Sequence, residues 1–195
     1  MKKKALVFGV FMMALVLSAC SGGFKADHNY SIEPFEFTNQ DKESVSLDDL
    51  KGEMWLAQFV FTTCTSVCPP MMTNMSELQE KLIEKDVEDY KIVSFSVDPE
   101  VDTPEKLGSY LEGFSVPDPS KWEMLTGYTM ADINDLAVKS FKMPVIDDPN
   151  TDQVVHGSRF GLVNKEGKVV KLYPGYEDVP YDTIVSDMKA LSKEN

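Results

Sequence analysis

The sequence predicts an α/β domain with a mixed central sheet flanked by helices. Met54–Phe61 is a dense apolar and aromatic run of strand length, as expected for a buried central strand. After it, strand patterns alternate with helical patterns, which is typical of an α/β domain. Near the end of the chain, two strand patterns flank Glu166-Gly167, a hairpin signal, and an amphipathic helical pattern follows them.

The first segment of the chain is predicted to be an export leader. Lys2, Lys3 and Lys4 precede an apolar or glycine run over residues 5–17, shorter than the roughly 20 apolar residues that span a membrane. Leu17-Ser18-Ala19-Cys20 resembles a bacterial lipobox, in which the cysteine becomes the lipidated first residue. We therefore expect residues 1–19 to be a lipoprotein signal peptide, and a lipid on Cys20 to anchor the protein to the extracytoplasmic face of a bacterial cell membrane.

Residues 20–30 are predicted to be a flexible, lipid-attached tether, because they are polar and contain Gly22-Gly23. His28 lies in this segment and is expected to be an exposed linker residue. Removal of residues 1–19 takes away three lysines and no acidic residue, so the formal charge changes from −13 to −16. A chain this acidic is not expected to bind nucleic acid through phosphate contacts. The remaining residues, 31–195, suffice for one domain with one core.

The elements of this domain are predicted in order from local patterns. A β-hairpin over 34–38 and 44–46 comes first. A short turn from Ser46 to Leu50 follows it and ends before Gly52. After the central strand, Pro69 or Pro70 begins a helix that extends to about Asp86. The later elements are a strand over 91–97, a helix capped by Thr103 that ends near Gly113, a strand over 122–125, a mostly helical segment over 130–141, strands over 157–164 and 168–173, and a closing helix that contains Ile184, Val185, Met188 and Leu191.

This order resembles the thioredoxin fold with an extra N-terminal β-hairpin. In open α/β sheets, functional sites lie at the carboxyl ends of strands. Cys64 and Cys68 directly follow the predicted central strand. The cysteine pair is therefore expected at the functional edge of the sheet.

Cys64 and Cys68 are predicted to carry redox or metal chemistry. If Cys20 is lipidated, these are the two cysteines left in an oxidising compartment. A disulfide between them would close a very small loop and would add little stability, so a structural staple is disfavoured. Their i, i+4 spacing lets both sulfurs face the same way, and the start of the following helix favours the thiolate form.

His156 lies 88 residues after Cys68, so only the fold could bring the two together. Two thiolates and an imidazole suit Cu(I), Cu(II) or an open zinc site, and this chemistry alone does not separate the metals. A structural zinc site would need four protein ligands, and three candidates are present. Met71, Met72 and Met75 are candidate soft ligands, but their helical spacing favours core packing.

The motifs together resemble the Sco family of copper-handling assembly factors for cytochrome c oxidase. They are Phe61-x-x-Cys64-x-x-x-Cys68-Pro69, the run from Ser96-Val-Asp98-Pro99 to Asp102-Thr103-Pro104-Glu105, and His156 ahead of Leu162-Val-Asn-Lys-Glu-Gly167. The resemblance covers about residues 31–192. It implies a thioredoxin-like fold and one copper ion, Cu(I) or Cu(II), bound by Cys64, Cys68 and His156. It also implies delivery of copper to, or preparation of, the dinuclear copper A centre of oxidase subunit II.

The chain departs from the family pattern at two positions. Many members carry an acidic residue between the cysteines, where this chain has Thr65-Ser66-Val67, and many have Asp before the histidine, where this chain has Val155. Both departures bear on affinity and redox poise, and neither removes a ligand. Asp98 is a candidate outer-shell carboxylate, and a turn-forming role before Pro99 is the alternative.

Two other functions share parts of this pattern. A thiol–disulfide reductase acting on the copper A cysteines would use Cys64 and Cys68 without metal, although the spacing is CxxxC rather than CxxC and His156 would have no task. A thiol peroxidase fits less well, because the PxxxTxxC pattern is incomplete around either cysteine. The sequence favours a metallochaperone over an enzyme. It leaves open the copper oxidation state, the affinity, and the balance between copper transfer and thiol reduction.

Overall fold

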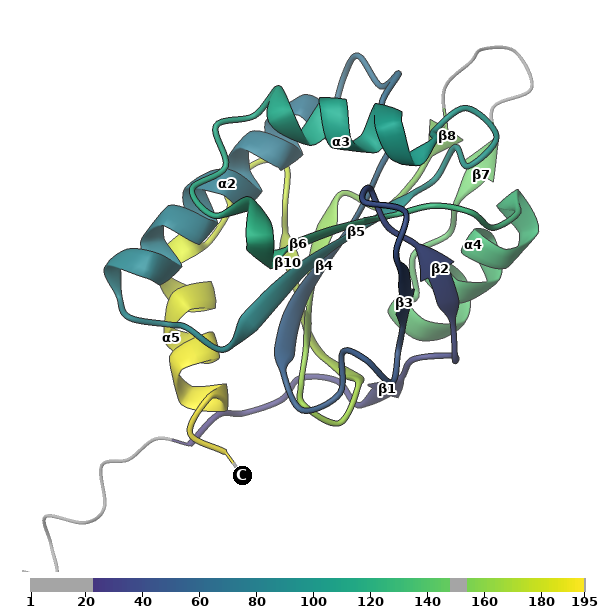
Figure 1. Cartoon of the computed structure of the whole chain (residues 1–195). Helices are drawn as coiled ribbons and strands as arrows, with labels where there is room; N and C mark the ends of the chain where they lie inside the picture. The colour runs from purple at the N-terminus through teal and green to yellow at the C-terminus, as the bar shows by residue number, and fades with distance from the viewer. Residues whose placement is uncertain (1–22, 148–153, 195) are drawn as a thin grey trace, which may run out of the picture.

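The computed structural model describes residues 23–147 and 154–194, where helices pack on a six-stranded mixed sheet (Figure 1). The strand order is β1-β10-β9-β4-β5-β6. Strands β4, β5 and β6 run parallel, while β9, β10 and β1 continue the sheet antiparallel from β4. The six strands are β1 (Tyr30–Ser31), β4 (Met54–Val60), β5 (Tyr90–Ser96), β6 (Trp122–Leu125), β9 (Arg159–Val163) and β10 (Lys168–Pro174). The predicted α/β class and mixed sheet are confirmed.

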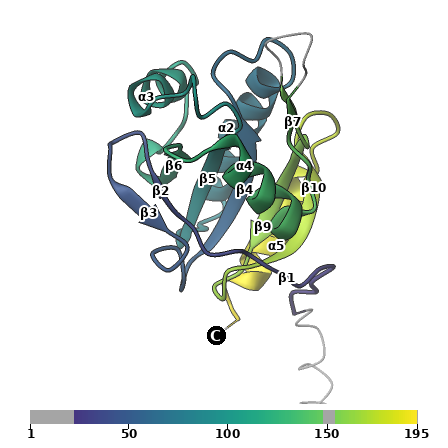
Figure 2. The same ribbon diagram turned by 90° about the vertical axis from the view of Figure 1, so that its right-hand side faces the viewer.

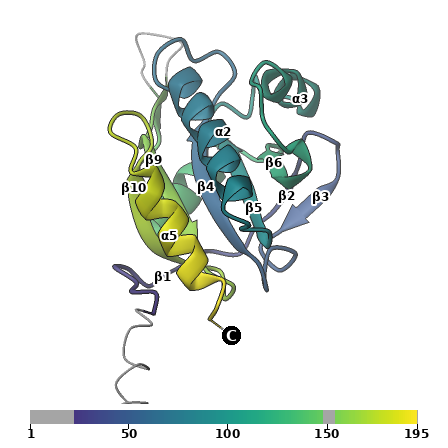
Figure 3. The ribbon, with the colours of Figure 1, turned by 90° about the vertical axis from the view of Figure 1, so that its left-hand side faces the viewer.

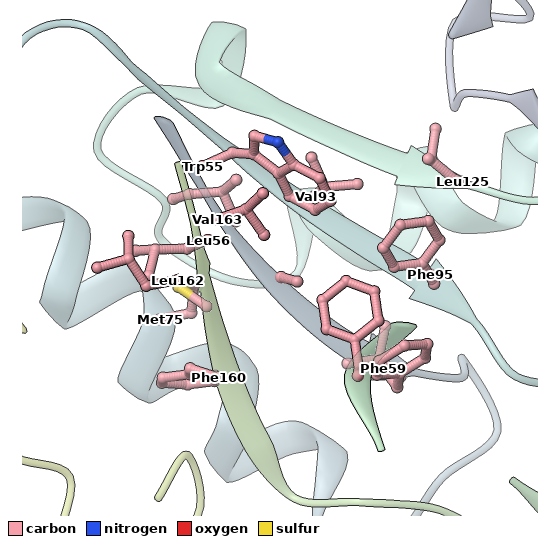
Figure 4. Close-up of a cluster of buried hydrophobic side chains, with 14 of the residues drawn as sticks. Trp55, Leu56, Phe59, Met75, Val93, Phe95, Leu125, Phe160, Leu162 and Val163 are labelled. Atoms are coloured by element: carbon pink, nitrogen blue, oxygen red, sulfur yellow. The ribbon is translucent and has the colours of Figure 1, made fainter. Parts of the chain in front are cut away.

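Strand β4 is the buried centre of this sheet, as its sequence predicts. All its residues are buried, and its side chains alternate between the two faces. Trp55 and Phe59 face a cluster that contains Phe95 and Phe141. Figure 4 shows this cluster of apolar side chains on the strands and on the neighbouring helix. Burial on both faces fixes the strand that leads into the cysteine loop.

Helices cover both faces of the sheet. Helices α2 (Cys68–Glu84) and α5 (Tyr181–Leu191) lie side by side over one face (Figure 3). Helix α4 (Met130–Leu136) and the π-helical turn η2 (Ala137–Phe141) lie on the opposite face (Figure 2). The predicted helical segment over 130–141 is thus confirmed, with a change of helix type at Ala137.

The three methionines at the start of α2 belong to the core. Met71, Met72 and Met75 are fully buried. The amide of Gln58 in β4 donates to the Met72 sulfur at 3.2 Å, which joins the central strand to α2. The core-packing interpretation of these residues is confirmed.

The N-terminal hairpin forms as predicted. Strands β2 (Glu36–Thr38) and β3 (Ser44–Ser46) pair antiparallel, with Phe37 opposite Val45. A backbone bridge between Thr38 and Thr126 ties this ribbon to the segment that follows β6.

The segment predicted to be a tether differs from the prediction in its second half. The backbone N–H groups of Asp27 and His28 both donate to the Val170 carbonyl, and Tyr30 begins strand β1 on the sheet edge. The His28 ring stacks on Tyr30 at 4.8 Å between centroids. The free edge of β10 accepts these backbone groups, which a composition-based prediction does not detect. The predicted signal peptide and Cys20 lie outside the described residues.

Helix α3 (Pro104–Glu112) and then the short 3₁₀ turn η1 (Pro119–Lys121) form the connection from β5 to β6. Thr103 is its N-cap, and its side chain accepts from the Lys106 N–H, as predicted. The closing helix and both late strands are also present at the predicted places, with β9 beginning at Arg159.

Among the described residues, no helix has the length and apolar character needed to cross a membrane.

One short ribbon was not predicted. Strands β7 (Ile146–Asp147) and β8 (Val154–Val155) pair antiparallel, with Ile146 opposite Val155. Their two-residue length is below what a sequence pattern can specify. The ribbon matters for the site because His156 directly follows β8.

Candidate metal centre

The cysteine loop lies at the carboxyl end of β4, where the prediction places it. Phe61 directly follows β4, and the Cys64 N–H donates to the Phe61 carbonyl at 3.3 Å, which closes a turn. Helix α2 then begins at Cys68, with Pro69 and Pro70 in its first turn. The sequence therefore places one cysteine on the turn and the other at the start of a helix.

The sulfur of Cys64 acts as the acceptor at the start of α2. The helix has no side-chain cap from Val67, and the Cys68 N–H donates to Cys64 Sγ at 3.3 Å. A helix N-terminus presents unpaired N–H groups and a partial positive charge, both of which favour an anionic sulfur. Cys64 is 6% exposed and Cys68 is fully buried, so a partner would reach Cys64 first.

His156 lies beside the cysteines, 88 residues away in sequence. Its Nε2 is 3.4 Å from Cys68 Sγ, and its Nδ1 is 3.3 Å from the Gly157 carbonyl. The His156 and Phe61 rings form a T-shaped pair, with 5.9 Å between centroids and 82° between planes. A proton on Nδ1 would bond the Gly157 carbonyl and leave the Nε2 lone pair toward the sulfur, the arrangement of a metal-binding histidine.

Gly157 lets this segment approach the domain closely. A Cβ at that position would lie 2.6 Å from the Met143 sulfur and 2.8 Å from Met143 Cγ. Only glycine accommodates such an approach without displacing the neighbour. Met143 is itself buried, so the backbone after His156 is held against the core.

The two thiols are electrostatically unequal. Burial raises the pKa of Cys64, but hydrogen bonds from His156, Cys68 and the backbone outweigh it and lower that pKa to about 6. Burial, together with the hydrogen bond and negative charge of Cys64, raises the pKa of Cys68 well above its ordinary value. The reduced pair therefore holds one thiolate, on the more accessible Cys64, and one thiol, on the buried Cys68.

This inequality predicts the order of thiol modification. Iodoacetamide should modify Cys64 first, with a rate that rises through about pH 6 and is nearly constant above pH 7, because only the thiolate reacts. Mass spectrometry of the peptides measures the rate at each site across pH. The Cys64→Ser variant should lose the fast phase. A midpoint near pH 9 for Cys64, or faster modification of Cys68, would contradict the assignment.

A buried carboxylate for which no role was predicted anchors the cysteine loop. Asp102 is 1% exposed and accepts hydrogen bonds from Thr62 Oγ1 at 2.5 Å, from Thr62 N at 3.2 Å and from Ser96 Oγ at 2.6 Å. It thereby ties the turn before Cys64 to the end of β5. Its signal in the sequence is an acidic residue just after a strand that runs parallel to the cysteine-bearing strand.

Asp98, the predicted outer-shell carboxylate, forms the turn that leads to Asp102. Its N–H donates to Ser96 Oγ, and its carbonyl accepts from the N–H groups of Val101 and Asp102. These backbone bonds match the turn-forming alternative. An outer-shell role for the Asp98 side chain stays a prediction.

The donor set fits a soft metal ion, although the three side chains are not yet arranged as ligands. Among the described residues, no group of three or more His, Cys, Asp and Glu side chains is placed to hold a metal ion. Cys64 Sγ accepts the Cys68 N–H, and Cys68 Sγ contacts His156 Nε2, so hydrogen bonds hold these donor atoms near one another. Both thiols are free in this structure, so both are available to ionise on binding.

Comparison with known proteins gives a consistent match. The family model SCO1/SenC matches residues 25–193. A SCO1 protein homolog from Bacillus subtilis (strain 168) is 46% identical over 190 residues, which cover 97% of this chain and 96% of the relative.

Solved structures of similar proteins agree with the fold. A SCO1/SenC family lipoprotein from Bacillus anthracis superposes with a TM-score of 0.81 at 42% identity, over 85% of this chain and 96% of the other. BsSco, described as a member of the Sco family of cytochrome c oxidase assembly proteins with a disulfide switch, gives 0.79 at 47% identity, over 87% and 98%. Copper-bound ScoI from Bradyrhizobium japonicum gives 0.67 at 27% identity, over 83% and 99%. The thioredoxin-like fold is confirmed.

Proposed function

This chain belongs to the SCO1/SenC family, and from that premise we propose that it binds one copper ion through Cys64, Cys68 and His156. It delivers this copper to, or prepares, the dinuclear copper A centre of cytochrome c oxidase subunit II. The observation that carries the proposal is the 3.4 Å approach of His156 Nε2 to Cys68 Sγ, beside the Cys64 thiolate. A copper-bound relative and a relative named for oxidase assembly support it.

The three side chains suit copper as a transferable cargo. Thiolates favour Cu(I), and the imidazole broadens the set to Cu(II). Copper binding requires Cys68 to lose its proton, so its burial makes binding pH-dependent. Protonation of Cys68 competes with copper binding, so the site can hold copper and still release it to a receiving centre.

The cysteine pair also supplies a release step. If the two copper-bound thiolates each give up one electron to an external disulfide, an S–S bond forms between Cys64 and Cys68, and the external S–S bond breaks to leave two thiolates. Copper then loses both thiolates, and only His156 remains as a ligand. Oxidation should therefore release copper, and reduction by a dithiol should restore binding.

A thiol–disulfide reductase without metal is the second candidate function. The unequal thiols favour it, because a reactive Cys64 thiolate beside a buried Cys68 thiol is an arrangement that attacks a disulfide and then resolves it. Its substrates would be the copper A cysteines of the oxidase. This function does not need His156.

Growth with and without added copper separates the two functions. Loss of the protein should impair oxidases that contain a copper A centre, while oxidases without this centre should assemble normally. If the chain is a copper donor, excess external copper should partly restore oxidase assembly by mass action, whereas an added thiol reductant should not restore it. Oxidase activity of membranes from each strain is the measurement. If added reductant restores oxidase assembly and added copper does not, the reductase is the better account of the function.

The proposed place of action is the extracytoplasmic face of a bacterial cell membrane, with Cys20 as the lipid-bearing residue. The lipobox-like sequence supports this location, and so does a relative described as a lipoprotein. Labelled fatty acid should be incorporated into the wild-type chain and not into Cys20→Ala. Equal labelling of both, or labelling of neither, would overturn the anchor.

A further inference from the structure

A groove between the last turn of α2 and the length of α5 contains four lysines that form no ion pair with any described residue. Three carboxylates line the same groove, so it carries one net positive charge on a chain whose net charge is −13. The lysines are Lys81, Lys85, Lys189 and Lys193, and the carboxylates belong to Glu84, Asp182 and Glu194. Each ammonium group is therefore available to donate to an external anion.

The N-terminal end of the described chain lies in the same groove. Gly23 is one of the lining residues, and from Phe24 onward the chain is held on the domain. The Lys171 ammonium lies 5.4 Å from the centroid of the Phe24 ring, and two successive backbone N–H groups farther along donate to the Val170 carbonyl. The groove is thus fixed to the place where the chain leaves the domain.

The proposed lipid on Cys20 brings this groove close to a membrane surface. Cys20 precedes Gly23 by three residues, which span about 10 Å when fully extended. This reach is similar to the Debye length of about 8 Å at physiological ionic strength, so headgroup charges are only partly screened at the lysines. The short reach and the positive charge of the groove together favour a lipid surface as its occupant.

We propose that this groove is the membrane-contact face of the domain, where its four lysines bind the phosphate groups of anionic phospholipids. The inference rests on the lipid anchor at Cys20 in the proposed function. Lysine side chains are long enough to extend past the carboxylates beside them and to place their charge among the headgroups. This contact restricts the rotation of the domain about its anchor.

The same contact directs the candidate metal centre away from the membrane. Helix α2 has 17 residues and a length of about 25 Å, with Cys68 at its start and the groove at its last turn. Figure 3 shows the start of α2 at one end of the molecule, and the N-terminal segment and the end of α5 at the other. Cys64 and His156 therefore face a partner domain that projects from the membrane.

The test is lysine acylation of the full, lipidated chain in two kinds of vesicle, phosphatidylcholine alone and phosphatidylcholine mixed with phosphatidylglycerol. A water-soluble ester should acylate the four groove lysines about fivefold more slowly in the mixed vesicles, because a bound ammonium group keeps its proton and is shielded from the reagent. Salt at about 1 M, which shortens the Debye length to roughly 3 Å, should remove the difference. Mass spectrometry of the peptides gives the rate at each lysine.

Lys106 is the matched control. It is exposed and forms no ion pair among the described residues, but it lies in the first turn of α3, close to the cysteine loop that Asp102 anchors. Its acylation rate should be the same in both kinds of vesicle. In the double variant Lys85→Gln and Lys189→Gln, the two remaining groove lysines should lose most of their protection, whereas Lys106→Gln should leave it intact.

Equal acylation of the groove lysines in the two kinds of vesicle would overturn the inference, and so would equal slowing at Lys106. Fatty-acid labelling separates this failure from that of the anchor. A chain that incorporates labelled lipid while its groove lysines stay unprotected defeats the membrane-contact face alone. A chain that incorporates no lipid defeats the proposed location, and this inference with it.

Discussion

Replacement of Cys64 or Cys68 by Ser is expected to abolish thiolate-to-copper absorption and to reduce copper binding to the background level. Each sulfur supplies a soft, charged ligand, and a serine hydroxyl at the same place is a hard, neutral and weak one. His156→Ala should retain Cu(I) binding in part, because Cu(I) accepts two thiolates, and should lose most Cu(II) binding. Absorption spectra and copper-to-protein ratios of the reduced chains measure these effects.

His28→Ala is the matched control for the histidine. His28 stacks on Tyr30 at the N-terminal edge strand, away from the cysteine loop, so its loss should leave copper binding unchanged. In cells, His156→Ala should prevent assembly of copper A oxidase at ordinary copper levels if the chain is a donor. Normal assembly in that strain would leave the reductase function as the better account.

Asp102→Ala is expected to destabilise the protein by about 3 kcal/mol, because it removes the acceptor of three donors, two on the partly buried Thr62 and one on the buried Ser96. The turn before Cys64 would also be released from β5. We therefore expect faster alkylation of Cys68, which is fully buried in the wild-type chain. Urea unfolding gives the first quantity, and peptide mass spectrometry gives the second.

Thr103→Ala separates the loop effect from a general loss of stability. Thr103 is adjacent to Asp102 and caps α3, so its replacement should cost about 1 kcal/mol and should not change Cys68 reactivity. If Asp102→Ala unfolds at the same urea concentration as the wild-type chain, the carboxylate does not anchor the loop.

Local patterns were sufficient for most of the fold. The unbroken apolar run of β4, the cap of α3 at Thr103 and the Glu166-Gly167 turn each specify their element within a few residues of sequence. The ribbon of β7 and β8 is too short to leave such a pattern. The edge pairing of Asp27 and His28 depends on a distant strand, so it also could not be predicted from composition.

The candidate site was predicted unevenly for the same reason. Cys64 and Cys68 carry their own signal, because their spacing, the prolines and the preceding strand are local. The approach of His156 to Cys68 came from family resemblance, and the bonds between Thr62 and Asp102 span 40 residues.

X-ray absorption at the copper edge of the reduced, copper-loaded chain tests the central claim most directly, because it reports which atoms bind the metal. We expect two sulfur ligands and one imidazole nitrogen in the wild-type chain, no imidazole in His156→Ala, and too little bound copper in Cys64→Ser and Cys68→Ser to give a signal above background. Copper bound by nitrogen and oxygen alone in the wild-type chain, or an unchanged ligand set in all three variants, would contradict the assignment of Cys64, Cys68 and His156 as the copper site.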